Sequence, residues 1–120
     1  TQVTMTSVPT DCVSWYLMLV GCSHSSGTAQ TIRVEFSSDN GTSWGGTNNL
    51  STAALSTDLL YGTIVYHLMN SATYVKLREG GSFSTSAFVN QTGIINAARF
   101  SWDSGGTFDA GQILIYGIRG

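Results

Sequence analysis

The chain has 120 residues, of which 42% are hydrophobic and only 10% are charged, and its formal net charge is −2. A length of this order suits one domain with a single continuous core, so we expect residues 1–120 to form one unit. The 5 basic residues are scattered singly, which argues against nucleic acid or an anionic membrane as a partner. No apolar run approaches the roughly 20 residues needed to span a bilayer, so membrane insertion is not expected.

Apolar residues recur at every second position along most of the chain, which is typical of β-strands. The predicted strands are 13–20, 31–36, 62–69, 74–78, 83–89, 94–102 and 112–118. The inward residues predicted most clearly are Ile32, Val34, Phe36, Val75 and Leu77, and the outward ones are Arg33, Glu35, Lys76 and Arg78. Residues 45–57 predict a long connection with a short helical turn at 52–55. Short strands between polar turns indicate an all-β antiparallel β-sandwich, with a jelly-roll as the preferred topology.

Two cysteines, Cys12 and Cys22, flank the first predicted strand. Ten residues of extended chain, at about 3.3 Å each, separate them by roughly 33 Å, which is far beyond the reach of a disulfide. We therefore expect free thiols, which suit assembly in the reducing cytoplasm of a host cell.

The first and last predicted strands carry apolar side chains on both faces. In the first, Val13, Trp15, Leu17 and Leu19 oppose Tyr16, Met18 and Val20, and in the last, Ile113 and Ile115 oppose Leu114, Tyr116 and Ile118. A two-layer sandwich covers only the inner face of each sheet, so the outer row needs a long loop or another copy of the chain. The low charge favours another copy. The predicted oligomer interface is Trp15, Tyr16, Met18, Leu114, Tyr116 and Ile118.

A turn-forming segment, SSDNGTSW, follows the strand 31–36. Its residues Ser37, Asp39, Gly41, Ser43 and Trp44 fit the pattern S-x-D-x-G-x-S/T-W, which resembles the Asp-box of sialidases and other β-proteins. The resemblance implies a hairpin turn in which Asp accepts hydrogen bonds, Gly takes a positive φ and Trp packs beneath the loop. In those families the motif is structural and lies away from the catalytic centre. A sialidase would also need several boxes and an arginine cluster, whereas this chain has one box and no such cluster.

The candidates for catalysis or metal binding are few. His24 lies in a Ser/Gly-rich segment that predicts a solvated side chain, and His67 alternates with its neighbours as a strand residue would. No G-x-S-x-G nucleophile motif is present, and Cys12, Cys22 and His24 match no known metal framework. The Gly-rich turns explain why Asp39, Asp103 and Asp109 are present without any chemistry, and calcium binding at one of these turns is the alternative. We predict no catalytic residue, no metal and no cofactor.

The C-terminal segment from Arg99 onward resembles the closing β-hairpin of many bacteriophage virion proteins. Phe108, Gly111, Ile113, Ile115, Tyr116 and Gly117 carry that likeness, which extends to the order of strand, loop and Asp-box in the first part of the chain. The resemblance implies a tail-fibre, receptor-binding or capsid-decoration module, commonly a homotrimer whose apolar faces meet near the threefold axis. No coiled-coil or β-helical shaft precedes the segment, which favours a decoration or a small docked module.

These observations predict a non-enzymatic virion surface protein that contacts other virion proteins and a host surface glycan or receptor. The alternative is a carbohydrate-binding module, for which Tyr61 and Tyr74 are the candidate glycan contacts, together with Trp44. A fragment of a sialidase or a lyase is a third and more distant reading.

Overall fold

The computed structural model describes residues 2–50, 53–67, 69, 74–81, 88–90 and 93–119. These residues form strands and turns with no helix, and every strand pairing is antiparallel. The strands are β1 Val3–Met5, β2 Cys12–His24, β3 Ile32–Ser37, β4 Gly45–Asn49, β5 Leu60–His67, β6 Tyr74–Gly81, β7 Phe88–Asn90, β8 Ala97–Trp102 and β9 Phe108–Arg119. The all-β antiparallel prediction is confirmed.

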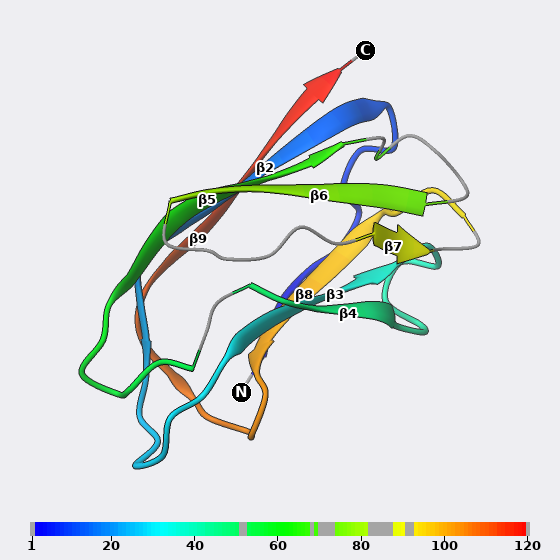
Figure 1. The fold of residues 1–120 in the computed structure, drawn as a ribbon. Helices are drawn as coiled ribbons and strands as arrows, with labels where there is room; N and C mark the ends of the chain where they lie inside the picture. Colours follow the sequence, from blue (N-terminus) through cyan, green and yellow to red (C-terminus); the bar gives the residue numbers. More distant parts are fainter. Residues whose placement is uncertain are drawn as a thin grey trace.

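The strands make two sheets, which Figure 1 shows as two layers. One sheet has four strands in the order β1-β8-β3-β4, and the other has five in the order β7-β6-β5-β2-β9. The chain changes layer between β1 and β2, and again between β2 and β3, so strands that pair are often far apart in sequence. The edge strands β1 and β9 lie on the same side of the molecule, because residues of both line the same two hollows.

The core lies between the two sheets and is dominated by aromatic side chains. Phe36 of β3 contacts Trp15 of β2 and Tyr66 of β5 edge-on, with ring centroids 6.1 and 4.9 Å apart. Such edge-to-face pairs add to the stabilisation gained from apolar burial. Other fully buried side chains are Leu17, Ile32, Val34, Ile64, Phe100 and Trp102. The predicted inward positions of 31–36 are therefore confirmed for all three apolar residues.

A bulge interrupts the long strand β2 where it passes β9. The register shifts between Val20 and Ser23, and Gly21 there has a φ of +64°. Across from it Gly111 has a φ of +102°, and a Cβ on Gly111 would lie 2.6 Å from the carbonyl oxygen of Gly21. Only glycine fits at that position, because any side chain would collide with the backbone of β2.

Three elements differ from the sequence predictions. Residues 45–49 form β4, which pairs with β3, because the preceding turn reverses the chain directly into a hairpin. Ala54 forms a bridge with Gln30, so extended backbone stands where the helical turn was predicted. The short strand β1 was not predicted at all. The predicted side-chain directions at 75–78, and the predicted strand residues 83–87, lie outside what the structure describes.

Removing the central ring of the core tests this packing. We expect Phe36→Ala to lower the free energy of unfolding by about 3–5 kcal/mol, because the cavity it leaves is enclosed by two rigid aromatic neighbours. Urea denaturation measures the change. Leu59→Ala is the control, since Leu59 is 55% exposed and should change stability by at most about 0.5 kcal/mol. A loss at Phe36 as small as the loss at Leu59 would contradict this account of the core.

Candidate functional site

The outward side chains of β2, β5 and β9 form a continuous surface. The strand register places Tyr16 between Tyr116 of β9 and Val65 of β5, and it places Met18 between Leu114 and Thr63. In the next row Ser14 lies between Ile118 and His67. We call the residues Tyr16, Met18, Leu114, Tyr116 and Ile118 the apolar outer face.

This surface is open to solvent in the single chain. Tyr16 is 37% exposed, Tyr116 55% and Ile118 47%, while Met18 and Leu114 are half-buried. The outward positions of β2 and β9 between residues 14 and 20 and between 112 and 118 are all uncharged. A contiguous, uncharged apolar row on a sheet face is typical of surfaces that contact another protein.

One residue of the predicted interface does not belong to this surface. Trp15 is fully buried, and its ring contacts Phe36 in the core. Its neighbours along β2 alternate across the sheet, so the side chain points between the layers while Tyr16 points outward. The prediction for Trp15 is therefore wrong, because apolar character alone does not separate the two faces of β2.

The segment 37–44 folds as a turn closed by the side chain of Asp39. Its Oδ1 accepts hydrogen bonds from Ser37 Oγ at 2.6 Å and from the Ser43 N–H at 2.9 Å. Its Oδ2 accepts a hydrogen bond from Ser43 Oγ at 2.5 Å. The Ser37 hydroxyl oxygen in turn accepts the N–H groups of Asp39 and Gly41. The carboxylate is thus occupied by donors of the loop itself.

The tryptophan at the end of this turn packs back on the loop and on the sheet. A Cβ on Gly41, which has a φ of +94°, would lie 3.3 Å from Trp44. The guanidinium of Arg99 lies 4.7 Å from the centroid of the Trp44 ring and forms two hydrogen bonds of 3.1 Å with Glu35. A cation held by both a ring and a carboxylate is well fixed. The turn is consequently anchored to β3 and β8.

Asn40 connects the same turn to two distant segments. Its Oδ1 accepts a hydrogen bond of 2.6 Å from the Ser7 N–H, and its own N–H donates to Asn96 Oδ1 at 2.8 Å. Asn40 has a φ of +57°, a conformation that asparagine adopts more readily than most residues. The turn therefore fixes the connection between β1 and β2.

His24 is buried rather than solvated, which corrects the sequence prediction. Its Nδ1 accepts a hydrogen bond of 3.1 Å from the Ser26 N–H, so its Nε2 carries the proton and donates to Ala54 O at 2.7 Å. The ring also packs edge-on against Trp102 at 4.7 Å. Both nitrogens are thus engaged in structure. His67 is half-buried, and its Nδ1 lies 3.2 Å from Ser14 Oγ.

The remaining candidates also have structural partners. Asp103 Oδ1 accepts the Thr31 N–H at 3.0 Å, and Asp109 Oδ1 accepts the Ser23 hydroxyl. Cys12 and Cys22 are both buried and free, as predicted, and burial raises the pKa of Cys22. Within the described ranges, no three His, Cys, Asp or Glu residues gather as metal ligands, and no helix is long and apolar enough to cross a membrane.

The structure describes the side chain of one of the two candidate glycan contacts. Tyr61 of β5 is 54% exposed, and its hydroxyl lies near Gly21, 3.2 Å from where a Cβ would stand. The side chain of Tyr74 lies outside the described part of the chain. Trp44 is half-buried and already packed against Arg99, so only Tyr61 presents a free aromatic surface among the described candidates.

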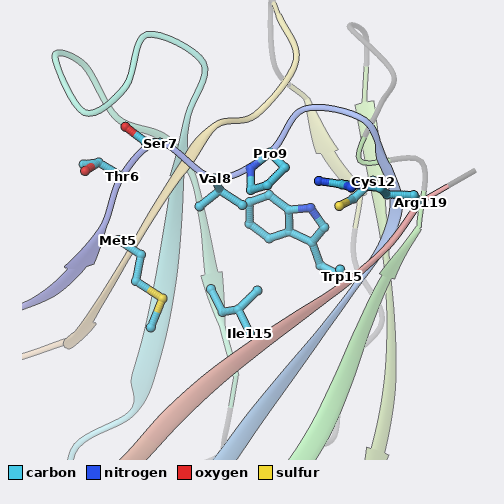
Figure 2. Close-up of a pocket in the computed structure, with 10 residues that line it drawn as sticks. Met5, Thr6, Ser7, Val8, Pro9, Cys12, Trp15, Ile115 and Arg119 are labelled. Carbon is cyan, nitrogen blue, oxygen red and sulfur yellow. The ribbon is translucent and has the colours of Figure 1, made fainter.

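The sequence did not predict the hollows between the sheets at the β1–β9 side. Figure 2 shows the larger one, a cavity of about 730 Å³ lined by Met5, Val8, Pro9, Trp15 and Ile115, among others. A second hollow of about 390 Å³ is lined by Val3, Phe108 and Ile113. Such hollows depend on two strands at opposite ends of the chain, and no local pattern indicates them.

Comparison of the chain with known proteins gives no matching family model and no matching curated protein. The residues and their geometry are therefore the basis for a functional proposal.

The pKa of Asp39 predicts a pH dependence of the turn. Hydrogen bonds from Ser37 and Ser43 lower this pKa from 3.8 to about 2. A carboxyl group with a lowered pKa in the folded state adds stability above its unfolded pKa, and this contribution is lost as the pH falls through the folded pKa. We expect Asp39→Asn to be less stable than the wild type at pH 5, with a difference that shrinks between pH 4 and pH 2. Urea denaturation at each pH measures it.

Two hydroxyl variants act as matched controls. Ser43→Ala removes a donor to Asp39 and should shrink the pH-dependent part of the stability, whereas Thr42→Ala removes a neighbouring hydroxyl that does not bond to the carboxylate and should preserve it. A constant difference between wild type and Asp39→Asn from pH 5 to pH 2 would contradict the assignment.

Proposed function

We propose that this chain is a non-enzymatic structural protein of a bacteriophage virion, a surface module that acts by homo-oligomeric assembly. The oligomer is a trimer in which the apolar outer faces of three copies meet. Its placement is the virion surface, after assembly in the host cytoplasm, and its partners are other virion proteins and a host surface glycan or receptor. We also propose a jelly-roll-like topology for the sandwich, which is supported by the position of β8 between β1 and β3 and by the repeated passage of the chain between layers.

The observation that supports assembly is the apolar outer face itself. It spans β2 and β9, two strands that pair along most of their lengths, so backbone hydrogen bonds hold its residues side by side. Its two tyrosines and Ile118 are 37–55% exposed in the single chain. A face of this kind favours a protein partner over solvent.

Burial of apolar area drives association where such faces meet. Each Å² of apolar surface that is buried contributes about 25 cal/mol, so the area shared between copies decides whether the gain exceeds the cost. Association costs roughly 4–15 kcal/mol in lost freedom. Because no charge lies in the outward rows of β2 and β9, little of the gain is lost to the desolvation of ions.

The polar side chains give no support to a catalytic reading. His24, Asp39, Asp103 and Asp109 each make hydrogen bonds that close a turn or join two strands. A general acid or base needs a free position beside a substrate, and a nucleophile needs an activating base. These four side chains are engaged in holding the backbone.

A charge placed in the outer face tests the proposal. We expect Tyr116→Asp to abolish the threefold contact while the chain stays folded, because three unpaired carboxylates would meet near one axis. Sedimentation velocity at micromolar concentration measures the mass, and circular dichroism measures the fold. Leu59→Asp is the matched control, since Leu59 is as exposed as Tyr116, at 55% each, but lies outside the face. A wild-type protein that is folded and monomeric at this concentration would contradict the proposal.

A carbohydrate-binding module is the second candidate, and the exposure of Tyr61 is the observation in its favour. Aromatic faces stack on sugar rings, and Tyr61 presents one on β5. A glycan array probed with the isolated protein should then reveal a defined sugar, and Tyr61→Ala should abolish that binding while Tyr16→Ala preserves it. Absence of glycan binding, with assembly retained, removes this candidate and leaves the virion module.

A further inference from the structure

Among the described strands, none pairs with one of the two edges of β9. This strand runs from Phe108 to Arg119, is 12 residues long and ends the five-stranded sheet. One of its edges pairs with β2, and no described strand lies along the other. The backbone N–H and C=O groups on an open edge form a template for another strand.

Between Gln112 and Ile118 this edge lacks the features that usually keep edge strands apart. Proteins protect open edges with lysine, proline, short strands, inward charges or bulges, and the register shifts between β2 and β9 lie at the two ends of that stretch. β9 contains neither lysine nor proline, and it is the second longest strand described. Its charges stand near its two ends, at Asp109 and Arg119, and the residues between them are uncharged.

We propose that the free edge of β9 pairs antiparallel with β9 of a second copy, so that the five-stranded sheet continues across a twofold axis. The charges indicate that the partner is a second copy of the chain and that the two strands run antiparallel. An antiparallel alignment brings the strand end that carries Asp109 beside the strand end of the second copy that carries Arg119. The twofold axis makes two such contacts. A parallel alignment would bring like charges together at both ends.

The alternation of side chains selects the register. A twofold axis normal to the sheet keeps the inner faces of both copies on one side, so each residue must oppose one of the same face. With Leu114 on the axis, Ile113 opposes Ile115 of the second copy on the inner face. On the outer face Gln112 then opposes Tyr116. This register matches the two inward isoleucines with each other.

The hollows at the same edge give an independent reason for a partner there. The larger cavity reaches Ile115 (Figure 2) and the smaller reaches Ile113, and residues of both β1 and β9 line each of them. Val3 and Met5 of β1 are only half-buried beside them. A second β9 alongside this edge covers the openings with its own isoleucines.

The ion pair that Arg119 makes within its own chain does not prevent this pairing. Arg119 Nε lies 3.0 Å from Asp11 Oδ2, and the two side chains are 71% and 59% exposed. Exposed pairs of this kind contribute little stability, so the guanidinium can be shared with another carboxylate. The pairing goes beyond the proposed trimer, since it uses the edge of β9 while the trimer uses the outer face.

Thiol cross-linking tests the pairing and its register in the full chain. With a short bismaleimide, we expect Leu114→Cys to form a covalent dimer with itself. Gln112→Cys and Tyr116→Cys should give a mixed product when the two variants are combined, with one of them tagged. Gln112→Cys alone should cross-link only weakly, whereas product from Tyr116→Cys alone reports the threefold contact. The wild type is the control for Cys12 and Cys22, which are buried. Efficient like-with-like products at 112 and 116, with no mixed product, would overturn the pairing while supporting a threefold contact.

Charge exchange gives a second, independent measurement. Asp109→Lys should weaken edge association by about tenfold, since two pairs of opposite charges become pairs of like charges. The variant also loses the acceptor of the Ser23 hydroxyl, so circular dichroism must show that it is folded. Adding Arg119→Glu should restore the edge association, and Asp11→Asn should leave it unchanged. Sedimentation equilibrium measures each association constant. A double variant that associates as weakly as Asp109→Lys would overturn the pairing. The Tyr116→Asp variant, which is designed to lose the threefold contact, distinguishes a failure of the edge pairing from a failure of the trimer.

Discussion

The structure depends on the constraint that β2 carries large apolar side chains on both faces. Its inward residues Trp15 and Leu17 pack against the opposite sheet and form the centre of the core. Its outward residues Tyr16 and Met18 lie beside the neighbouring strands, and within the described residues no second layer of strands covers them. A two-layer sandwich can bury one of these faces, so the second face makes association the natural way to complete the burial of β2.

Polar residues are concentrated where the chain must turn, and this leaves the strands β2 and β9 free of charge along their middle. The turn around Asp39 shows how much structure a few polar side chains can hold. It closes the β3–β4 hairpin, fixes Trp44 on Arg99 and, through Asn40, holds the connection that begins at Ser7. That connection forms one wall of the larger cavity. A local turn thereby determines the shape of a distant edge.

Sequence periodicity was sufficient where side chains alternate clearly between environments. Ile32, Val34 and Phe36 alternate with charged residues, so their burial followed directly from period two. The same rule could not assign Trp15, because both faces of β2 are apolar and only the opposing sheet distinguishes them. His24 was misassigned for a related reason, since its serine-rich surroundings resemble a loop while its burial depends on Ala54 and Trp102. The hollows beside β1 depend on contacts between the two ends of the chain.

Both surfaces offered for assembly belong largely to β9, and this follows from where the strand lies. As the last described strand of its sheet it contributes Leu114, Tyr116 and Ile118 to the outer face, and no described strand pairs with its other edge. Face and edge are perpendicular, so a contact on one leaves the other accessible. The proposed threefold contact through the face and the proposed twofold contact through the edge would together join trimers to one another, as the proposed role on a particle surface requires. A strand with charges spread along its length would support neither contact.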